Sequence, residues 1–216
     1  MEFDLCFGYG KNLLFENQRI EFDDGDKVLL IGDSKSGKTA IFEFMSGIIG
    51  KKSINLNNNA KKIIISFLPS KPVFFENRTV LYNLKYAMRV ARMKDVERLN
   101  DAVAFADCAD KLKTKVKDLS YVEKQILACA RAKIKKPDLI LIDVFFHNDD
   151  QDVDKLINVI TKVLNFDCSV VLASRGFVAK PWKFDKAFLV NDHKVETYDS
   201  LKDLKKVYPF YSKFKS

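Results

Sequence analysis

The chain has 216 residues, a length that suits one α/β domain with a small subdomain, and its apolar content of 47% is enough for a sizeable core. The formal net charge is +8, but the lysines are scattered and no block of five or more like charges occurs. We therefore expect a generally basic surface and no nucleic-acid partner.

Cysteine usage and hydropathy exclude further classes of protein. The four cysteines, Cys6, Cys108, Cys129 and Cys168, form no C-x-x-C pair, so neither a zinc site nor a disulfide framework is expected. They indicate reduced thiols of a cytosolic protein. No signal peptide opens the chain, and no apolar run approaches the roughly 20 residues that a membrane helix needs. The sequence thus predicts a soluble, cytoplasmic protein that reaches a membrane only through a partner, at its inner face.

The first 50 residues contain the most informative motif. Residues 1–24 alternate polar and apolar side chains around a turn near 8–11, which predicts antiparallel strands at the edge of a sheet. A turn at 24–26 leads into an apolar run at 28–31, and an apolar-rich stretch at 40–49 is long enough for a helix. Between them lies a match to G-x-x-x-x-G-K-[ST], in the strand, loop and helix order that a phosphate-binding loop requires. The loop consists of Gly32, Asp33, Ser34, Lys35, Ser36, Gly37, Lys38 and Thr39.

Each fixed position of this loop has a chemical reason. Gly32 and Gly37 let the loop curl so that successive backbone N–H groups face one anion. The helix that starts near Lys38 adds its positive N-terminal end. The Lys38 ammonium reaches the outer phosphates, and the Thr39 hydroxyl is a ligand for Mg²⁺. Lys35 adds positive charge or is simply a solvated loop lysine.

The middle of the chain predicts a helical insertion. A polar, turn-rich stretch at 55–59 is followed by a buried strand at 63–68, which Pro69 stops. Residues 71–118 form the expected insertion, since 79–93 and 95–109 both have helical apolar spacing. A further helix should begin near Leu119-Ser120, with Ser120 as the N-cap and Glu123 completing a capping box.

The last third alternates strands and helices again. Buried strands are expected at 139–143 and 169–173, a helix at 151–165, and a closing hairpin at 187–190 and 195–198 that turns through Asn191-Asp192. Continuous apolar strands separated by helices predict an α/β phosphate-loop fold with a mostly parallel sheet covered on both faces. The strand at 139–143 ends in Asp143, the type of residue that holds Mg²⁺ opposite a phosphate loop.

This ordered set of features resembles the ATP-binding domain of ABC transporters over nearly the whole chain. Leu119-Ser120-Tyr121-Val122-Glu123 stands at that family's Leu-Ser-Gly-Gly-Gln signature, and Ala130-Arg131-Ala132 follows it as the family's Ala-Arg-Ala does. Lys136-Pro137-Asp138 leads into the Asp143 strand, and residues 185–198 resemble the family's closing hairpin. The resemblance implies that Tyr9 stacks on adenine, that Asp150 belongs to the loop after the Asp143 strand, and that Leu119 and Ser120 contribute to a dimer interface.

The departures from the family pattern concern hydrolysis. The position of the general-base Glu holds Val144, and the position of the switch His holds Arg175. Ser70 replaces the Gln that senses Mg²⁺ and water in resembling proteins. Tyr121 and Val122 replace the two signature glycines, and we expect their side chains to keep a partner's backbone from the γ-phosphate. The histidines His147 and His193 are interpreted as surface residues.

These observations predict a single ABC-type domain over 1–216, with 71–118 as a helical subdomain. It would bind ATP and Mg²⁺ and be impaired in hydrolysis, because the groups that orient the attacking water are missing; whether it is an ATPase is left open. The implied partners are a second ATP-binding subunit, the same or different, and a membrane-spanning subunit that meets 71–118. The rival from another class is a soluble nucleotide-dependent dimerisation or scaffold protein. A phosphate-loop kinase is a third alternative, disfavoured by the absence of an Arg-rich lid.

Overall fold

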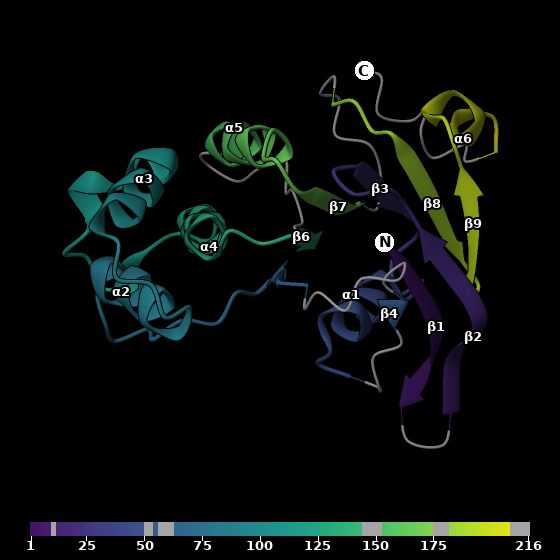
Figure 1. The fold of residues 1–216 in the computed structure, drawn as a ribbon, viewed down its shortest axis with the longest axis horizontal. Coiled ribbons are helices and arrows are strands. Elements are labelled where there is room, and N and C mark those ends of the chain that lie inside the picture. Colours follow the sequence, from purple (N-terminus) through teal and green to yellow (C-terminus); the bar gives the residue numbers. More distant parts are fainter. Residues whose placement is uncertain (10–11, 50–53, 56–62, 144–152, 175–181, 208–216) are drawn as a thin grey trace. The chain divides into compact units, whose positions relative to one another are not determined.

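The computed structural model describes residues 1–9, 12–49, 54–55, 63–143, 153–174 and 182–207, with 54–55, 153 and 205–207 described by their backbone alone. The chain divides into two compact units (Figure 1). Unit 1 comprises Met1–Phe67, Asp138–Val144 and Asp167–Ser216, and unit 2 comprises Leu68–Pro137 and Phe145–Phe166. The expected insertion at 71–118 falls within unit 2, which is larger than that range because it also contains two later helices.

Unit 1 is built on a six-stranded sheet of order β5-β6-β7-β3-β8-β9. Its strands are β3 (Lys27–Ile31), β5 (Ile65–Leu68), β6 (Leu139–Asp143), β7 (Ser169–Ser174), β8 (Lys186–Asn191) and β9 (Lys194–Tyr198). β3 pairs in parallel with β7 and β8, and β6 pairs in parallel with β7, whereas β8 and β9 are antiparallel. The mostly parallel sheet predicted from the apolar runs is therefore confirmed.

Alternate residues of β3 point to opposite faces of this sheet, and each face has its own core. Val28 and Leu30 belong to the larger cluster, together with residues of helix α1 (Lys38–Ser46), and Leu29 and Ile31 to a second one. The second cluster includes Leu204 of helix α6 (Leu201–Val207). Within unit 1 the sheet thus has a helix on each face, which explains why its central strands are apolar without interruption.

A second, smaller sheet replaces the sheet edge that was expected for the N-terminal strands. β1 (Glu2–Tyr9) and β2 (Asn12–Glu21) are antiparallel as predicted, but they pair with β4 (Ile54–Asn55) in a separate sheet of order β2-β1-β4. The expectation was wrong because the apolar side chains of β1 face α1 instead of extending the large sheet. Phe7 shows this, since its ring stacks on that of Phe44 with centroids 4.5 Å apart.

Unit 2 is helical in its described parts. Its helices are α2 (Val80–Val90), α3 (Val96–Ala106), α4 (Tyr121–Lys135) and α5 (Val153–Leu164), with two short 3₁₀ turns, η1 (Ala109–Lys111) and η2 (Val116–Asp118), between α3 and α4. α2 and α3 are shorter than the expected 79–93 and 95–109, because Thr79 and Asp95 cap them and Asp107 ends α3 in a left-handed conformation. Among the described residues, no helix combines the length and the apolar character needed to cross a bilayer.

Candidate functional site

The G-x-x-x-x-G-K-[ST] loop lies where β3 ends and α1 begins, as the sequence predicted. Gly32 follows the last strand residue, and α1 starts at Lys38 with Gly37 at its N-cap. Gly37 has a φ of 104°, a left-handed value that favours glycine, and as a glycine it brings no side-chain cap to this helix end. This helix end is suited to an anion, because the first N–H groups of an α-helix have no partner within the helix.

Both loop glycines lie in places where a side chain would not fit. A Cβ atom on Gly32 would approach the carbonyl oxygen of Val190 to 2.3 Å, and one on Gly37 would approach the ring of Phe15 to 2.7 Å. Phe15 comes from β2 and is almost fully buried. The aromatic wall that Phe15 provides was not predicted from the sequence, because nothing local to the loop indicates which residue of β2 reaches it.

The Lys38 side chain is held against its own loop. It is 7% exposed, and its Nζ donates to the carbonyl oxygens of Gly32 and Asp33, at 2.7 Å each, and to Ser36 Oγ at 3.2 Å. The ammonium thus lies inside the curl of the loop, whereas Lys35 is exposed with a φ of 67°. Of the two loop lysines, Lys38 has the burial and the ordered geometry that a phosphate-contacting group needs.

The hydroxyl of Thr39 meets the carboxylate of Asp143. Thr39 Oγ1 donates to Asp143 Oδ2 at 2.6 Å, and Asp143 is 2% exposed at the carboxyl end of β6. A hydroxyl and a carboxylate placed together are the hard oxygen ligands that Mg²⁺ prefers. Elsewhere in the part of the chain that the structure describes, no group of three or more His, Cys, Asp or Glu is arranged to hold a metal.

Tyr9, the residue expected to stack on adenine, lies at the end of β1 and is 55% exposed. Its hydroxyl donates to Glu43 Oε2 of α1 at 3.1 Å. Desolvation, the hydrogen bond to Glu43 and the charge of that carboxylate all raise the pKa of the Tyr9 hydroxyl. The ring is therefore tethered to the first helix yet open to solvent. Glu43 was not predicted as a partner of Tyr9, because 34 positions separate the two residues in the sequence.

The stretch that matches the family signature forms the start of α4. Ser120 Oγ accepts from the backbone N–H of Glu123, and a carboxylate oxygen of Glu123 accepts from the N–H of Ser120. This confirms the predicted capping box. Lys111 also forms an ion pair with Glu123, at the position where the family pattern has Gln.

The two side chains that replace the signature glycines differ in direction. Val122 is 2% exposed and packs inside unit 2, while Tyr121 is partly exposed at the helix start. The expectation that both would obstruct a partner's backbone is thus wrong for Val122, because the first turn of α4 directs that side chain into the apolar interior. Any obstruction at the surface falls to Tyr121.

The segment around Ser70 is fixed from α4. Gln125, fully buried, donates through Nε2 to the carbonyl oxygen of Ser70 at 2.7 Å. Among the residues that the structure describes, its Oε1 has no hydrogen-bond partner. Sequence reasoning did not identify Gln125, although a polar residue on the apolar face of a helix is a usable signal for a buried contact.

Four residues discussed from the sequence, Val144, His147, Asp150 and Arg175, lie outside the described residues. His193, in contrast, is exposed in the turn between β8 and β9, as expected. That turn consists of Asp192 and His193, one residue later than predicted, because both adopt the positive φ values of a two-residue hairpin turn.

Comparison with known protein families and curated proteins adds a sequence-based view. The family model described as ABC transporter matches residues 15–144. A zinc import ATP-binding protein of Ehrlichia ruminantium is 25% identical over 177 residues, covering 79% of this chain and 71% of that protein. A molybdate/tungstate import ATP-binding protein of Pyrococcus horikoshii is 32% identical over 157 residues, covering 66% of this chain. The latter match spans 46% of the Pyrococcus protein, so this chain corresponds to less than half of it.

Solved structures give the same fold. The structure of an ATP-binding subunit of an ABC transporter superimposes with a TM-score of 0.79, at 18% identity, over 98% of this chain and 93% of that one. A nucleotide-free ATP-binding cassette from an ABC transporter gives a TM-score of 0.73 at 16% identity, over 96% and 95% of the two chains. At these identities the likeness establishes the fold.

Proposed function

This chain belongs to the ABC transporter family, and we propose that it is an ATP-binding subunit that holds ATP with Mg²⁺ but is impaired in hydrolysing it. The observation that carries the proposal is the arrangement of Lys38, Thr39 and Asp143. A buried ammonium lies inside a glycine-bounded loop, and a hydroxyl and a carboxylate are hydrogen-bonded beside it. Lys38 would contact the outer phosphates, and Thr39 and Asp143 would hold Mg²⁺, which neutralises phosphate charge when bound.

The rest of the loop would contribute by its backbone. We assign to residues 32–39 the role of a phosphate cradle, supported by the left-handed Gly37 at the N-terminus of α1. Tyr9 would carry the base on its exposed ring, while the hydrogen bond to Glu43 ties that ring to α1. These assignments use groups on β1, on the loop 32–37, on α1 and on β6.

Impaired hydrolysis follows from what stands at the positions where the family has its water-orienting groups. Val144 has no group that can accept a proton, and Ser70 is too short to replace the amide of Gln. Positioning groups of this kind are worth roughly 10²–10⁴-fold in rate when they act in general acid–base chemistry. With the bulk of Tyr121 at the signature, the site would bind nucleotide and hold it.

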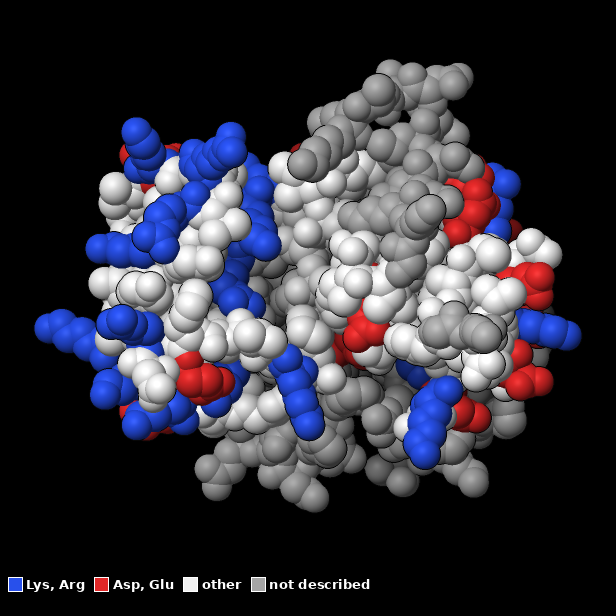
Figure 2. All heavy atoms as spheres, turned by 90° about the horizontal axis from the view of Figure 1, so that it is seen from below, with Lys and Arg blue, Asp and Glu red and all other residues white. Residues whose placement is uncertain are grey.

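A membrane-spanning subunit is the proposed partner of residues 71–118. The relatives named above are import ATP-binding proteins, for zinc and for molybdate or tungstate, and we propose that this chain likewise serves a membrane complex. Residues 68–137 carry 16 Lys and Arg but 8 Asp and Glu, whereas the remainder of the chain is balanced. Figure 2 shows these cations gathered over one face of the helices of unit 2.

A groove between α2 and α3 gives this face a specific partner chemistry. It encloses about 670 Å³, and its described lining combines an apolar floor with four cations and no carboxylate. The cations are Lys85, Arg89, Arg92 and Lys94, all exposed. Such a groove would receive the apolar side of a helix whose polar side is acidic.

Affinity purification from the native host tests the proposal against its rival. We expect the tagged chain, extracted in mild detergent, to retain a membrane-spanning protein, and we expect Lys85→Glu with Arg89→Glu to release it. Lys113→Glu with Lys117→Glu is the matched control, because these exposed lysines belong to the same unit but do not line the groove. Recovery of a second soluble subunit without any membrane protein would favour the dimerisation or scaffold role instead.

A further inference from the structure

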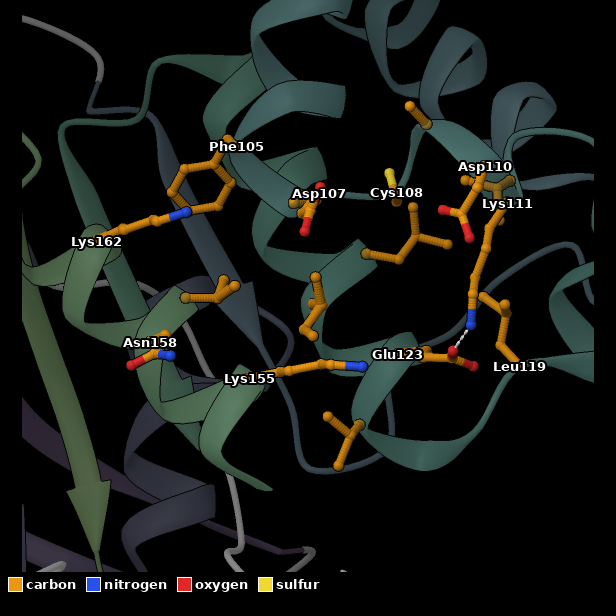
Figure 3. A pocket seen from close by; sticks show the side chains of 17 residues that line it. Phe105, Asp107, Cys108, Asp110, Lys111, Leu119, Glu123, Lys155, Asn158 and Lys162 are labelled. Atoms are coloured by element: carbon orange, nitrogen blue, oxygen red, sulfur yellow. Dashed lines mark hydrogen bonds and ion pairs between the residues drawn. The ribbon is translucent and has the colours of Figure 1, made fainter. Parts of the chain in front are cut away.

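A second hollow in unit 2 is lined in part by the start of α4. It has a volume of about 550 Å³, within the range of small-molecule sites, and all its lining residues belong to unit 2 (Figure 3). Its floor is apolar and consists of side chains that are at most 8% exposed, among them Leu119, Val122, Ile126, Leu127 and Val159. Polar side chains surround this floor, so the hollow has the composition of a ligand site.

Charges of opposite sign lie on its two walls. Asp107 ends α3 and Asp110 belongs to η1, whereas Lys155 and Lys162 come from α5 on the other side (Figure 3). The two lysines are seven residues apart, with Asn158 between them on the same face of the helix. All five of these residues are exposed. A purely anionic or purely cationic ligand would meet like charge on one wall.

Contacts within each wall support this division. The thiol of Cys108 lies on the acidic wall, where burial first and then the charges of Asp110 and Asp107 raise its pKa. On the basic wall, Lys162 Nζ lies 5.9 Å from the centroid of the Phe105 ring. Lys111 and Glu123 also line the hollow, at the Cys108 end, and form an ion pair with each other (Figure 3). Apart from this ion pair, the carboxylates of the hollow lie on the Cys108 side and its lysines lie on α5.

We propose that this hollow binds a small zwitterion with an apolar body, of the α-amino acid class. The ligand's ammonium would lie against Asp107 and Asp110, its carboxylate would accept from Asn158 and Lys162, and its side chain would cover the apolar floor. Charge-assisted hydrogen bonds at both ends would set the orientation, and the floor would set the preference for an apolar side chain.

The hollow adjoins the stretch that matches the family signature, and this position connects it with the proposed nucleotide-dependent role. Leu119, Val122 and Glu123 line it, and they flank Ser120 and Tyr121 in the turn that opens α4. A ligand would therefore contact the side chains that hold this turn, including the ion pair of Lys111 with Glu123. This regulatory consequence rests on the proposed function, whereas the binding itself does not.

Calorimetry of the full chain without nucleotide tests the binding. L-Leucine and L-phenylalanine are the probes, and 4-methylpentanoate and isopentylamine are analogues of leucine that each lack one charge. We expect leucine or phenylalanine to bind and both analogues to bind at least about 10-fold more weakly, because each loses one charge-assisted contact. Absence of binding by both amino acids, or equal binding of the analogues, would overturn the proposal.

Variants on the two walls make the test specific. Asp107→Asn keeps a residue that tolerates the left-handed backbone at this position, and Lys162→Gln is at an exposed site, so both should fold. Each should weaken leucine binding by about 10-fold or more, since one charged partner is lost. Asp101→Asn and Lys113→Gln, exposed residues of the same unit outside the hollow, should leave it unchanged. Full affinity in both wall variants would contradict the assignment.

Thiol labelling at pH 8.5 gives a second readout within the same sample. Cys108 is half-buried in the hollow, and Cys6 is exposed on β1, so bound leucine should slow labelling of Cys108 and leave Cys6 unaffected. Lys38→Ala should lose ATP binding and retain leucine binding. Leucine binding without ATP binding would therefore count against the proposed function alone, and ATP binding without leucine binding would count against this inference alone.

Discussion

The hydroxyl of Thr39 donates a 2.6 Å hydrogen bond to the carboxylate of Asp143, although 104 positions separate the two residues. The bond joins the first turn of α1 to the carboxyl end of β6. Both oxygens are of the hard type that Mg²⁺ selects. The bond therefore places the proposed metal ligands of the two halves of the site side by side.

Asp143→Asn should remove most of the Mg²⁺ dependence of nucleotide binding. The amide keeps the size of the side chain but loses the charge that would compensate the metal, so ATP affinity with Mg²⁺ should fall about 10-fold or more while affinity without Mg²⁺ changes little. Titration calorimetry with and without Mg²⁺ measures both. Asp192→Asn, in the exposed β8–β9 turn, is the control. An Mg²⁺ effect of full size in Asp143→Asn would place the metal elsewhere.

Lys38→Ala should abolish detectable ATP binding. The ammonium is buried inside the loop and bonded to loop carbonyls, so its removal takes away both a phosphate contact and part of the loop's support. Lys35→Asn is the matched control, because Lys35 is exposed and Asn tolerates its left-handed backbone. Calorimetry should show near-normal affinity for the control. Equal losses in both variants would mean that general loop charge, and not Lys38, governs binding.

Tyr9→Ala should weaken ATP binding by roughly 1–3 kcal/mol if the ring stacks on adenine as aromatic platforms do on other bases. Tyr9→Phe separates stacking from the tether to Glu43, since it keeps the ring and loses the 3.1 Å hydrogen bond. We expect Tyr9→Phe to lie close to the wild type in a competition assay between ATP and a fluorescent nucleotide. Unchanged affinity in a folded Tyr9→Ala would leave Tyr9 with a packing role.

Gly37→Ala should lower the free energy of unfolding by more than Gly25→Ala does. Both glycines have positive φ, 104° and 95°, so each substitution incurs backbone strain of about 1–3 kcal/mol. A Cβ at Gly37 would also meet the Phe15 ring at 2.7 Å, whereas one at Gly25 meets nothing within 4 Å. Guanidinium unfolding of the two variants should therefore separate the strain from the clash. Equal losses would show that Phe15 moves aside without cost.

Much of the fold follows from local sequence, and the exceptions share one cause. Apolar strands, the loop and the Ser120 capping box depend on neighbouring residues, and the structure has them where the sequence predicted. The pairing of β1 with β4 was missed, because it joins segments about 50 positions apart and one of them is only two residues long. Strand alternation shows that a face is buried but not what buries it.

The parts of the site that belong to a motif of several residues were predictable from the sequence. The parts that depend on the direction or the contacts of a single side chain were not. The loop and Asp143 were found from spacing and type. Val122 was misplaced although the start of α4 was predicted correctly, because its expected exposure came from the match to a signature glycine and not from its place on the helix. Glu43 and Gln125 act through contacts with distant segments; the place of Gln125 on an apolar helix face signals a buried contact, but the sequence does not identify the partner of either residue.

The central claim, ATP binding without turnover, is tested most directly by steady-state phosphate release from the purified chain. We predict no release above background for the wild type or for Val144→Glu alone. Val144→Glu with Tyr121→Gly should release more than the two single variants combined, because groups that act as a unit are not additive. Val122→Gly should add little release and should cost stability instead, because that side chain is buried. Robust release by the unmodified chain that Lys38→Ala eliminates would contradict the account.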